Sequence, residues 1–304
     1  MPNLLDEKSA KRMARGTGFS ALRITPNNVT TADLVEKAAE PILACEQKDE
    51  IGALVFVSQT PDFVLPSTGH ILQNRLGLGH DTLCIDISEG CSGYITGIYN
   101  ASLLAKQLNK KVLFLCGDTI SKLTSIDDRA TRCIFGDAGT ATLIEPGDED
   151  IVFSFSSYGE KSDAIIVENS GQRKVPSPKN GGCLYLDGSA IMEFAVNETL
   201  EEIKKFIYMC GLRTEQITLF ACHQANKVIL NSLAEGLGVL QLKIPFTAEK
   251  IGNESSASIP LVLSQKSGTV DLSRVLCVGF GVGLSIGIAM TDFSKTRFLG
   301  VSEL

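Results

Sequence analysis

Cys91 has the residue type and the position of a covalent nucleophile. It lies in "EGCSGYITGI", where an expected strand over 82–87 gives way to an expected helix over 91–108. Unpaired backbone N–H groups and the helix dipole at such a position favour negative charge and lower a cysteine pKa. The pattern therefore predicts a thiolate nucleophile. The alternative, one more buried cysteine, suits the other eight cysteines better.

His223 and Asn253 are the polar partners that such a sulfur would need. His223 lies in "ACHQANKVI", at the carboxyl end of an expected strand over 217–224, where α/β sheets present ligand-contacting groups. Asn253 lies in "KIGNESSASIPLVL" and precedes an expected helix over 255–266, a position suited to an N-cap. Taken singly, a strand-end histidine and a capping asparagine are structural features as often as catalytic ones.

The composition limits the class of protein. The chain has 304 residues, 44% of them hydrophobic, and a net charge of −7, which argues against nucleic-acid binding because phosphate affinity rests on Lys and Arg. Its nine cysteines form no C-x-x-C pair, as in a reducing cytosol, so we expect a cytoplasmic protein. With three histidines and no Cys/His cluster, we expect no metal site.

Strands and helices alternate along the chain, which predicts an α/β fold with helix-covered sheets. The uncharged run at 275–291 contains four glycines, so we interpret it as two buried strands around a turn and not as a membrane helix. The remaining expected strands cover 53–59, 82–87, 111–118, 138–145 and 217–224, and the helices cover 31–45, 91–108, 192–210, 226–237 and 255–266.

The two halves of the chain echo each other. "DEIGALVFVSQTP" (49–61) and "TEQITLFACHQAN" (214–226) both lead through acidic and amide residues into a strand, and "VLFLCGD" resembles "VLCVGFG". We interpret this as an internal duplication, with an N-terminal half over 1–150 that carries the cysteine and a C-terminal half over 151–304 that carries the histidine and the asparagine.

Together these motifs resemble the ketosynthase III branch of the thiolase superfamily, that is, β-ketoacyl-acyl-carrier-protein synthase III and its relatives. The resemblance runs from about Lys11 to Ile288 and includes "EGCSGYITGI", "DDRATRCIFGDAGTA", "HQANKVI", "GNESSASIP" and "GFGVGLSIG". It implies a thiolase-like five-layer αβαβα sandwich made of two duplicated halves, which is usually a homodimer. Family members open with a strand before the segment matching 8–19, so we expect that N-terminal strand to be missing.

The resemblance also implies a role for each site residue. Cys91 would accept the acyl group, and the backbone N–H groups of Cys91 and Val282 would form the oxyanion hole. A malonyl thioester would then lose CO₂ while His223 and Asn253 donate hydrogen bonds to its thioester oxygen. The resulting carbanion would attack the acyl group and release a β-ketoacyl product, as in fatty acid or polyketide biosynthesis.

Four further residues match family positions at the substrate site. Phe280 would pack against the nucleophile, and Arg129 would lie near the phosphopantetheine entrance unless it is an ordinary surface arginine. Gln224 and Asn226, which belong to the H-Q-A-N motif, would contribute to substrate binding.

The implied partners are an acyl carrier protein, an acyl thioester and a second copy of the chain, with no membrane and no cofactor. The substrates would be acyl-CoA or acyl-carrier protein, and malonyl-carrier protein. The chain has no Trp to stack on the adenine of CoA, which favours a carrier protein as the donor. An acidic carrier protein would need a local basic face, for which the candidates are Lys8, Lys11, Arg12, Arg15, Lys204, Lys205 and Lys227.

Other activities remain as alternatives. Within the same fold, the chain could be an acyltransferase that passes the acyl group to an alcohol or amine without decarboxylation. It could also be a non-catalytic subunit that binds an active ketosynthase. A thiolase would need a second catalytic cysteine such as Cys277, and a papain-like protease would need a Trp after its cysteine; neither motif fits.

Overall fold

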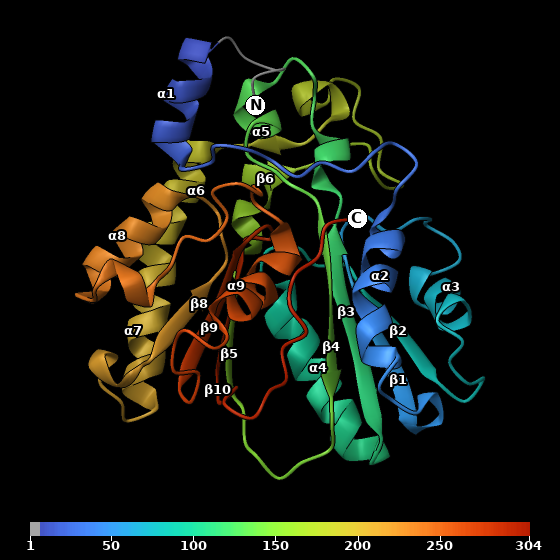
Figure 1. The fold of residues 1–304 in the computed structure, drawn as a ribbon. Coiled ribbons are helices and arrows are strands. Elements are labelled where there is room, and N and C mark those ends of the chain that lie inside the picture. Colours follow the sequence, from blue (N-terminus) through green and yellow to red (C-terminus); the bar gives the residue numbers. More distant parts are fainter. Residues whose placement is uncertain (1–6) are drawn as a thin grey trace.

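Two mixed β-sheets form the centre of the molecule. The computed structural model describes residues 7–304 (Figure 1). The first sheet has the order β2-β1-β3-β4 and the second has the order β5-β10-β9-β8. Their strands are β1 (Ile51–Val57), β2 (Leu83–Ile87), β3 (Lys111–Asp118), β4 (Ala138–Ile144), β5 (Val152–Ser157), β8 (Leu219–Cys222), β9 (Val275–Gly281) and β10 (Ser285–Thr291).

Helices cover both outer faces and fill the space between the sheets, which gives the five-layer αβαβα order (Figure 1). The outer helices of the first sheet are α2 (Thr31–Leu43) and α3 (Thr68–Arg75). Between the sheets lie α4 (Gly93–Leu108) and α9 (Ser258–Lys266). The outer helices of the second sheet are α6 (Gly188–Phe194), α7 (Leu200–Met209) and α8 (Lys227–Leu237). The predicted thiolase-like sandwich is confirmed.

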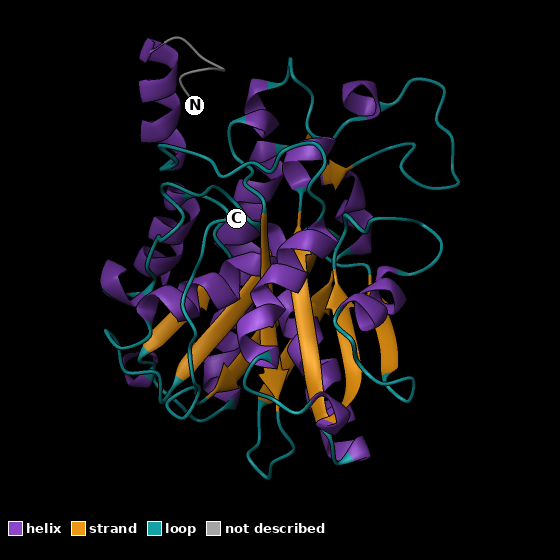
Figure 2. Ribbon diagram, turned by 45° about the vertical axis from the view of Figure 1, so that its right-hand side comes forward, coloured by secondary structure: helices purple, strands orange, loops and turns teal. Residues whose placement is uncertain are grey.

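A loop-rich cap lies at one end of the sandwich (Figure 2). It contains the short elements of the 146–190 connection together with two helices, α1 and α5. The elements of the cap are α1 (Glu7–Thr17), α5 (Arg129–Arg132), β6 (Ile165–Ile166) and β7 (Tyr185–Leu186).

The continuous apolar runs of the sequence are strands buried on both faces. Along β3, Val112, Phe114 and Cys116 face the central layer, whereas Leu113 and Leu115 face the outer layer under α2. A strand covered on both sides needs no polar face, which explains its uninterrupted hydrophobicity. Helix α4 approaches β3 closely because Gly97 has no side chain: a Cβ there would lie 2.1 Å from the Phe114 ring.

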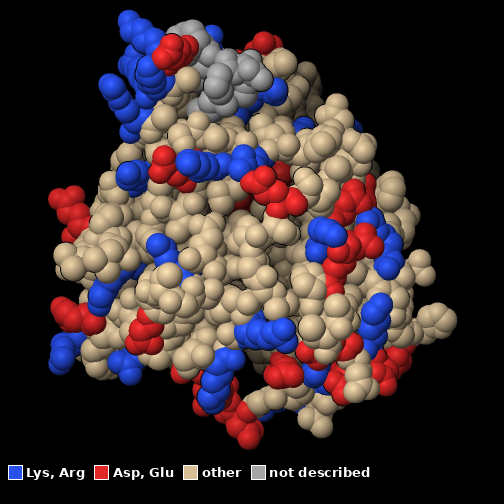
Figure 3. Space-filling view, in the orientation of Figure 1, with Lys and Arg blue, Asp and Glu red and all other residues tan. Residues whose placement is uncertain are grey.

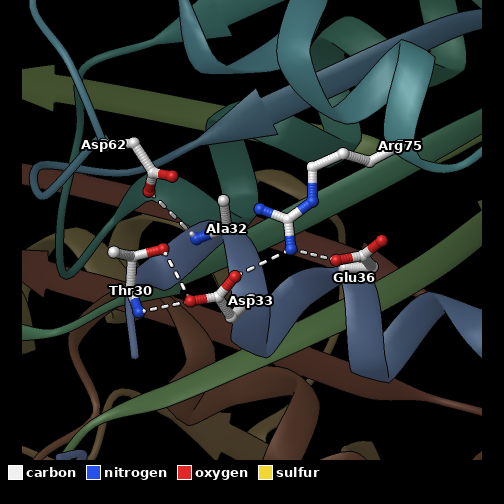
Figure 4. Close-up of polar contacts among 6 residues, drawn as sticks. All are labelled: Thr30, Ala32, Asp33, Glu36, Asp62 and Arg75. Atoms are coloured by element: carbon white, nitrogen blue, oxygen red, sulfur yellow. Dashed lines mark hydrogen bonds and ion pairs between the residues drawn. The ribbon is translucent and has the colours of Figure 1, made fainter. Parts of the chain in front are cut away.

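The outer helices are fixed by side-chain contacts at their ends (Figure 4). Thr30 precedes α2, and its backbone N–H donates to Oδ2 of Asp33 at 2.8 Å, as in a capping box. Arg75, at the end of α3, donates to Oδ1 of Asp33 at 2.7 Å and also to Glu36. These contacts join α2 and α3 into one layer over the first sheet.

The duplication is visible in the sheets. In each, two neighbouring strands run parallel and the next strand runs antiparallel: β1, β3 and β4 in the first sheet, and β8, β9 and β10 in the second. The second sheet also has β5 antiparallel to β10. Residues 7–50 contain no strand, so none of them pairs with β4 in the way that β5 pairs with β10.

Some predicted elements need correction. The strand over 82–87 is an edge strand with Leu83 44% exposed, not a buried one, because only β1 pairs with it. The helix over 192–210 is interrupted by a π-helical turn at Ala195–Thr199. The run at 275–291 is confirmed as two buried strands, β9 and β10, and no helix among the described residues is long and apolar enough to span a membrane.

Candidate active site

Cys91 lies where α4 begins, in contact with the end of β9. The helix itself starts at Gly93, with Ser92 as its N-cap residue, so the cysteine is two residues before the first turn. A Cβ on Gly281 would come within 2.8 Å of Cys91 Sγ, and one on Gly279 would come within 2.9 Å of the Cys91 carbonyl oxygen. Glycines at these two positions of β9 therefore allow the second half of the chain to reach the sulfur.

The turn after β9 presents a hydrogen-bond donor to the same sulfur. The backbone N–H of Val282 bonds to Cys91 and lowers the pKa of its thiol. The turn is held by Ser285, whose hydroxyl donates to Val282 O at 3.0 Å and pairs with the Ser92 hydroxyl at 2.7 Å. Ser92 also donates to Glu89 at 2.6 Å. This chain fixes the position of the Val282 N–H relative to the start of α4.

The protonation state of Cys91 differs from the one predicted. Burial, with a smaller contribution from the negative charge of Asp118, raises the pKa of the thiol to about 11 against the lowering effects of Val282 and Ser255. Removal from water disfavours the thiolate more than the helix start stabilises it. The resting form is therefore a thiol, and the expected thiolate at neutral pH was wrong.

His223 follows the last residue of β8 and is 1% exposed. Its backbone N–H donates to Val278 O at 2.8 Å, which continues the pairing between β8 and β9. Its ring packs edge-on against Phe280, with 5.5 Å between ring centroids. Burial lowers the pKa of His223 to about 4, against a raising effect of the Ser255 backbone, so the ring is neutral at pH 7.

Asn253 lies in a loop that is fixed from both sides by backbone hydrogen bonds. Its N–H donates to Ile134 O at 2.9 Å, and its carbonyl accepts from Gly136 N at 3.0 Å. Asn253 Oδ1 accepts the N–H of Ser255 at 3.0 Å, while Glu254 is the N-cap of the following 3₁₀ turn. The sequence predicted Asn253 as the N-cap, whereas the structure has Glu254, the next residue, in that position. The side-chain amide N–H₂ stays available as a donor.

Ser255 joins these groups and was missed by the sequence analysis. Its side chain hydrogen-bonds to Cys91, and its backbone hydrogen-bonds to His223. Its N–H donates to Oδ1 of Asn253. Its φ is +50°, an unusual left-handed value for a non-glycine residue. A serine in a Ser-rich segment gives no sign of this backbone conformation.

Gln224 and Asn226 make structural contacts instead of facing the sulfur. Gln224 is 1% exposed, donates to Pro245 O at 3.2 Å and accepts from Thr247 N at 2.8 Å, so it fixes the loop beside β8. Asn226 is the N-cap of α8, with Oδ1 accepting from Ile229 N at 2.8 Å.

Arg129 is exposed at the surface. It begins α5 and, with Arg12 and Met13 of α1, lines a cleft of about 290 Å³. Basic side chains gather over α1 at this edge of the molecule (Figure 3). Lys227 lies beside the same edge. A Cβ built on Gly18, the residue after α1, would lie 2.5 Å from the Cβ of Lys227.

The site therefore combines a thiol, a neutral imidazole, a carboxamide and an inward-pointing backbone N–H, contributed by both halves of the chain. These are the groups needed for acyl transfer through a covalent thioester. Among residues 7–304 no cluster of three or more His, Cys, Asp or Glu side chains could hold a metal ion.

Such a site at the junction of two duplicated sheets defines a thiolase-fold acyltransferase. Two family models match the chain: 3-oxoacyl-[acyl-carrier-protein (ACP)] synthase III over residues 85–160, and the C-terminal model of the same synthase over residues 208–293. The chain belongs to the 3-oxoacyl-[acyl-carrier-protein] synthase III family, and is a condensing enzyme of that type.

Individual relatives are similar over most of their length. The β-ketoacyl-[acyl-carrier-protein] synthase III of Streptococcus mutans is 32% identical over 89% of this chain and 87% of its own. That of Clostridioides difficile is 31% identical, over 91% and 88%. The crystal structure of a 3-oxoacyl-(acyl-carrier protein) synthase from Burkholderia xenovorans superimposes with a TM-score of 0.89, at 32% identity, over 95% of this chain and 87% of that one.

Proposed function

We propose that Cys91 accepts the acyl group from an acyl thioester. The sulfur attacks the thioester carbonyl, a new C–S bond forms, and the bond from that carbonyl to the donor sulfur breaks. The neutral ring of His223 takes the proton from Cys91 as the sulfur attacks and returns it to the departing sulfur, so that the donor leaves as a thiol. The N–H groups of Cys91 and Val282 would stabilise the oxyanion. The observation that carries the proposal is the close approach of the end of β9 to the sulfur, where a Cβ on Gly281 would lie 2.8 Å from Cys91 Sγ.

The second half of the reaction is a decarboxylative condensation with malonyl-carrier protein. As the malonyl group loses CO₂, negative charge builds on its thioester oxygen, to which His223 and the Asn253 amide donate. The carbanion then attacks the acyl carbonyl, the bond to Cys91 breaks, and a β-ketoacyl thioester leaves. The support is that both donors are buried, at 1% and 5% exposure, where a hydrogen bond to a developing charge is strongest.

The test separates the two half-reactions. His223→Ala and Asn253→Ala should release CO₂ from malonyl-carrier protein about 10²–10³-fold more slowly than the native enzyme, since each loses one oxyanion donor. Asn253→Ala should still become acylated. CO₂ release at the native rate in both variants would contradict the assigned roles. An acylated native enzyme that releases no CO₂ would favour the alternative acyltransferase, which needs no decarboxylation.

We further propose that the carrier protein docks over α1. Lys8, Arg12 and Arg15 are exposed on this helix, and Arg129 lines the adjoining cleft. Two of the other candidates, Lys204 and Lys205, are paired with Glu201 and Glu202 on α7 and suit a docking role less well. The cleft carries arginines and no aromatic ring, which favours a carrier-borne donor over CoA.

A homodimer through the β2 edge is also proposed. Among the described residues only β1 pairs with β2, and exposed apolar side chains lie on β2, on α4 and on β5, where the rings of Tyr99 and Phe155 are in contact. The exposed fractions are 44% for Leu83, 39% for Tyr99, 51% for Leu103 and 45% for Phe155. A second copy would cover these side chains. Nine free cysteines support a reducing, cytoplasmic setting.

A further inference from the structure

Asp118 is a fully buried carboxylate at the end of β3, close to the site but with no assigned part in the reaction. Its Oδ1 accepts from the N–H of Gln59 at 2.7 Å and from the hydroxyls of Ser58 and Thr60 at 3.1 and 3.3 Å. These three residues directly follow β1. One oxygen of the carboxylate is therefore bound to the first half of the molecule.

The other oxygen is bound to the loop that carries Asn253. Oδ2 of Asp118 accepts from the Ser256 hydroxyl at 2.9 Å and from the Ser256 N–H at 3.4 Å. Ser255, the residue before it, bonds to Asn253 and contacts Cys91 and His223. The carboxylate thus connects β1, in the first half, to the loop of the second half that contributes the oxyanion donor.

Every partner of Asp118 donates a hydrogen bond to it, and two of these partners are backbone N–H groups, which cannot accept one. A carboxylate accepts on both oxygens, whereas an amide would turn an N–H₂ toward one set of donors. Burial raises the pKa of Asp118, and the hydrogen bonds from Gln59 and Ser256 lower it. Asp118 is therefore connected to the site through its hydrogen bonds.

We propose that Asp118 is a positioning residue: by binding the end of β1 with one oxygen and Ser256 with the other, it holds the 253–256 loop where the Asn253 amide serves decarboxylation. This rests on the function proposed for Asn253. Without the carboxylate, the loop keeps its backbone bonds to Ile134 and Gly136 but loses its anchor to β1. The decarboxylation step should depend on this anchor more than substrate binding does.

Asp118→Asn and Ser256→Ala are the test variants, with Asp187→Asn as the matched control, since Asp187 caps α6 through backbone N–H groups away from the site. Both test variants should release CO₂ from malonyl-carrier protein about 10- to 100-fold more slowly in kcat, with KM within about twofold of native.

The outcomes are distinguishable. A native kcat in a folded Asp118→Asn enzyme overturns the inference. If that variant does not fold, as judged by its thermal melt, Ser256→Ala decides: a native kcat there overturns the inference, and a reduced kcat supports it. If the native enzyme itself releases no CO₂, the proposed function fails first. If Asp187→Asn slows CO₂ release as much as Asp118→Asn does, the loss of any carboxylate slows the enzyme, and the inference about Asp118 is overturned.

Discussion

At the scale of residues, Cys91 shows how burial and local donors compete for one proton. Two donors, Val282 and Ser255, stabilise the thiolate, but desolvation and the charge of Asp118 oppose them, and the pKa of the thiol rises to about 11. His223, with its pKa lowered to about 4 by burial, stays neutral over the physiological range. The resting forms are therefore a thiol and a neutral imidazole.

The raised pKa predicts how fast Cys91 reacts with iodoacetamide. The thiolate fraction rises about tenfold per pH unit below the pKa, so the alkylation rate should climb steadily from pH 7 to pH 10. The rate can be followed by peptide mass spectrometry, with the exposed Cys45 as the internal reference. A rate that levels off below pH 8 would mean that the thiolate is stabilised after all.

The residue types and their order, chiefly through the family resemblance, were enough to predict the family and the fold. That Cys91, His223 and Asn253 act together in one catalytic site stays a prediction. Two things could not be read from the sequence. Ser255 acts through a left-handed backbone value that serine rarely adopts, and Asp118 acts through partners that lie more than fifty residues away on both sides. The pKa of Cys91 was mispredicted because helix position is local information, whereas burial depends on the whole fold.

At the scale of elements, the turn between β9 and β10 is the part of the fold that completes the site. Gly281 has a φ of +149°, and a Cβ there would meet Cys91 Sγ at 2.8 Å. The next residue, Val282, presents its N–H to the sulfur. The backbone at this point must approach the nucleophile closely and in a conformation that side chains disfavour.

Gly281→Ala should therefore slow acylation of Cys91 strongly while leaving a folded protein. The added methyl group occupies the space of the attacking sulfur and displaces the Val282 N–H, so we expect acylation to slow by about 10²-fold or more. Gly147→Ala, where a Cβ meets nothing within 4 Å, is the control. Acylation of the Gly281 variant at the native rate would show that this close approach is unimportant.

Elements with strong patterns were well predicted, whereas details that depend on neighbours were not. The run at 275–291 was correctly interpreted as two strands because its glycines break helical packing. The apolar composition of β2 predicted a buried strand, but β2 lies at the edge of its sheet. Which strand lies at an edge depends on the pairing between strands, which composition does not show. The π-helical turn at Ala195–Thr199 has no signature in composition.

At the scale of the whole molecule, the site belongs to the junction between the two halves. Cys91 comes from the first half, and His223 and Asn253 come from the second, while the Glu89–Ser92–Ser285 chain and Asp118 cross between them. The side chains proposed for acyl transfer and for decarboxylation therefore come from different halves of the chain.

The basic edge formed by α1 should govern recognition of an acidic carrier protein. Arg12→Glu with Arg15→Glu should raise the KM for malonyl-carrier protein about tenfold or more at low salt, with kcat nearly unchanged, and the difference should shrink as salt screens the charges. Lys204→Glu, on α7, is the control. An unchanged KM in the α1 variant would place the docking surface elsewhere.

The central claim, that Cys91 accepts the acyl group, is tested most directly by intact-protein mass spectrometry after incubation with a panel of acyl-carrier proteins and acyl-CoAs. The native enzyme should gain the mass of one acyl group, on the peptide that contains Cys91, and Cys91→Ala should gain none. An equal gain in Cys91→Ala, an adduct on another cysteine, or no adduct with any thioester would contradict the account.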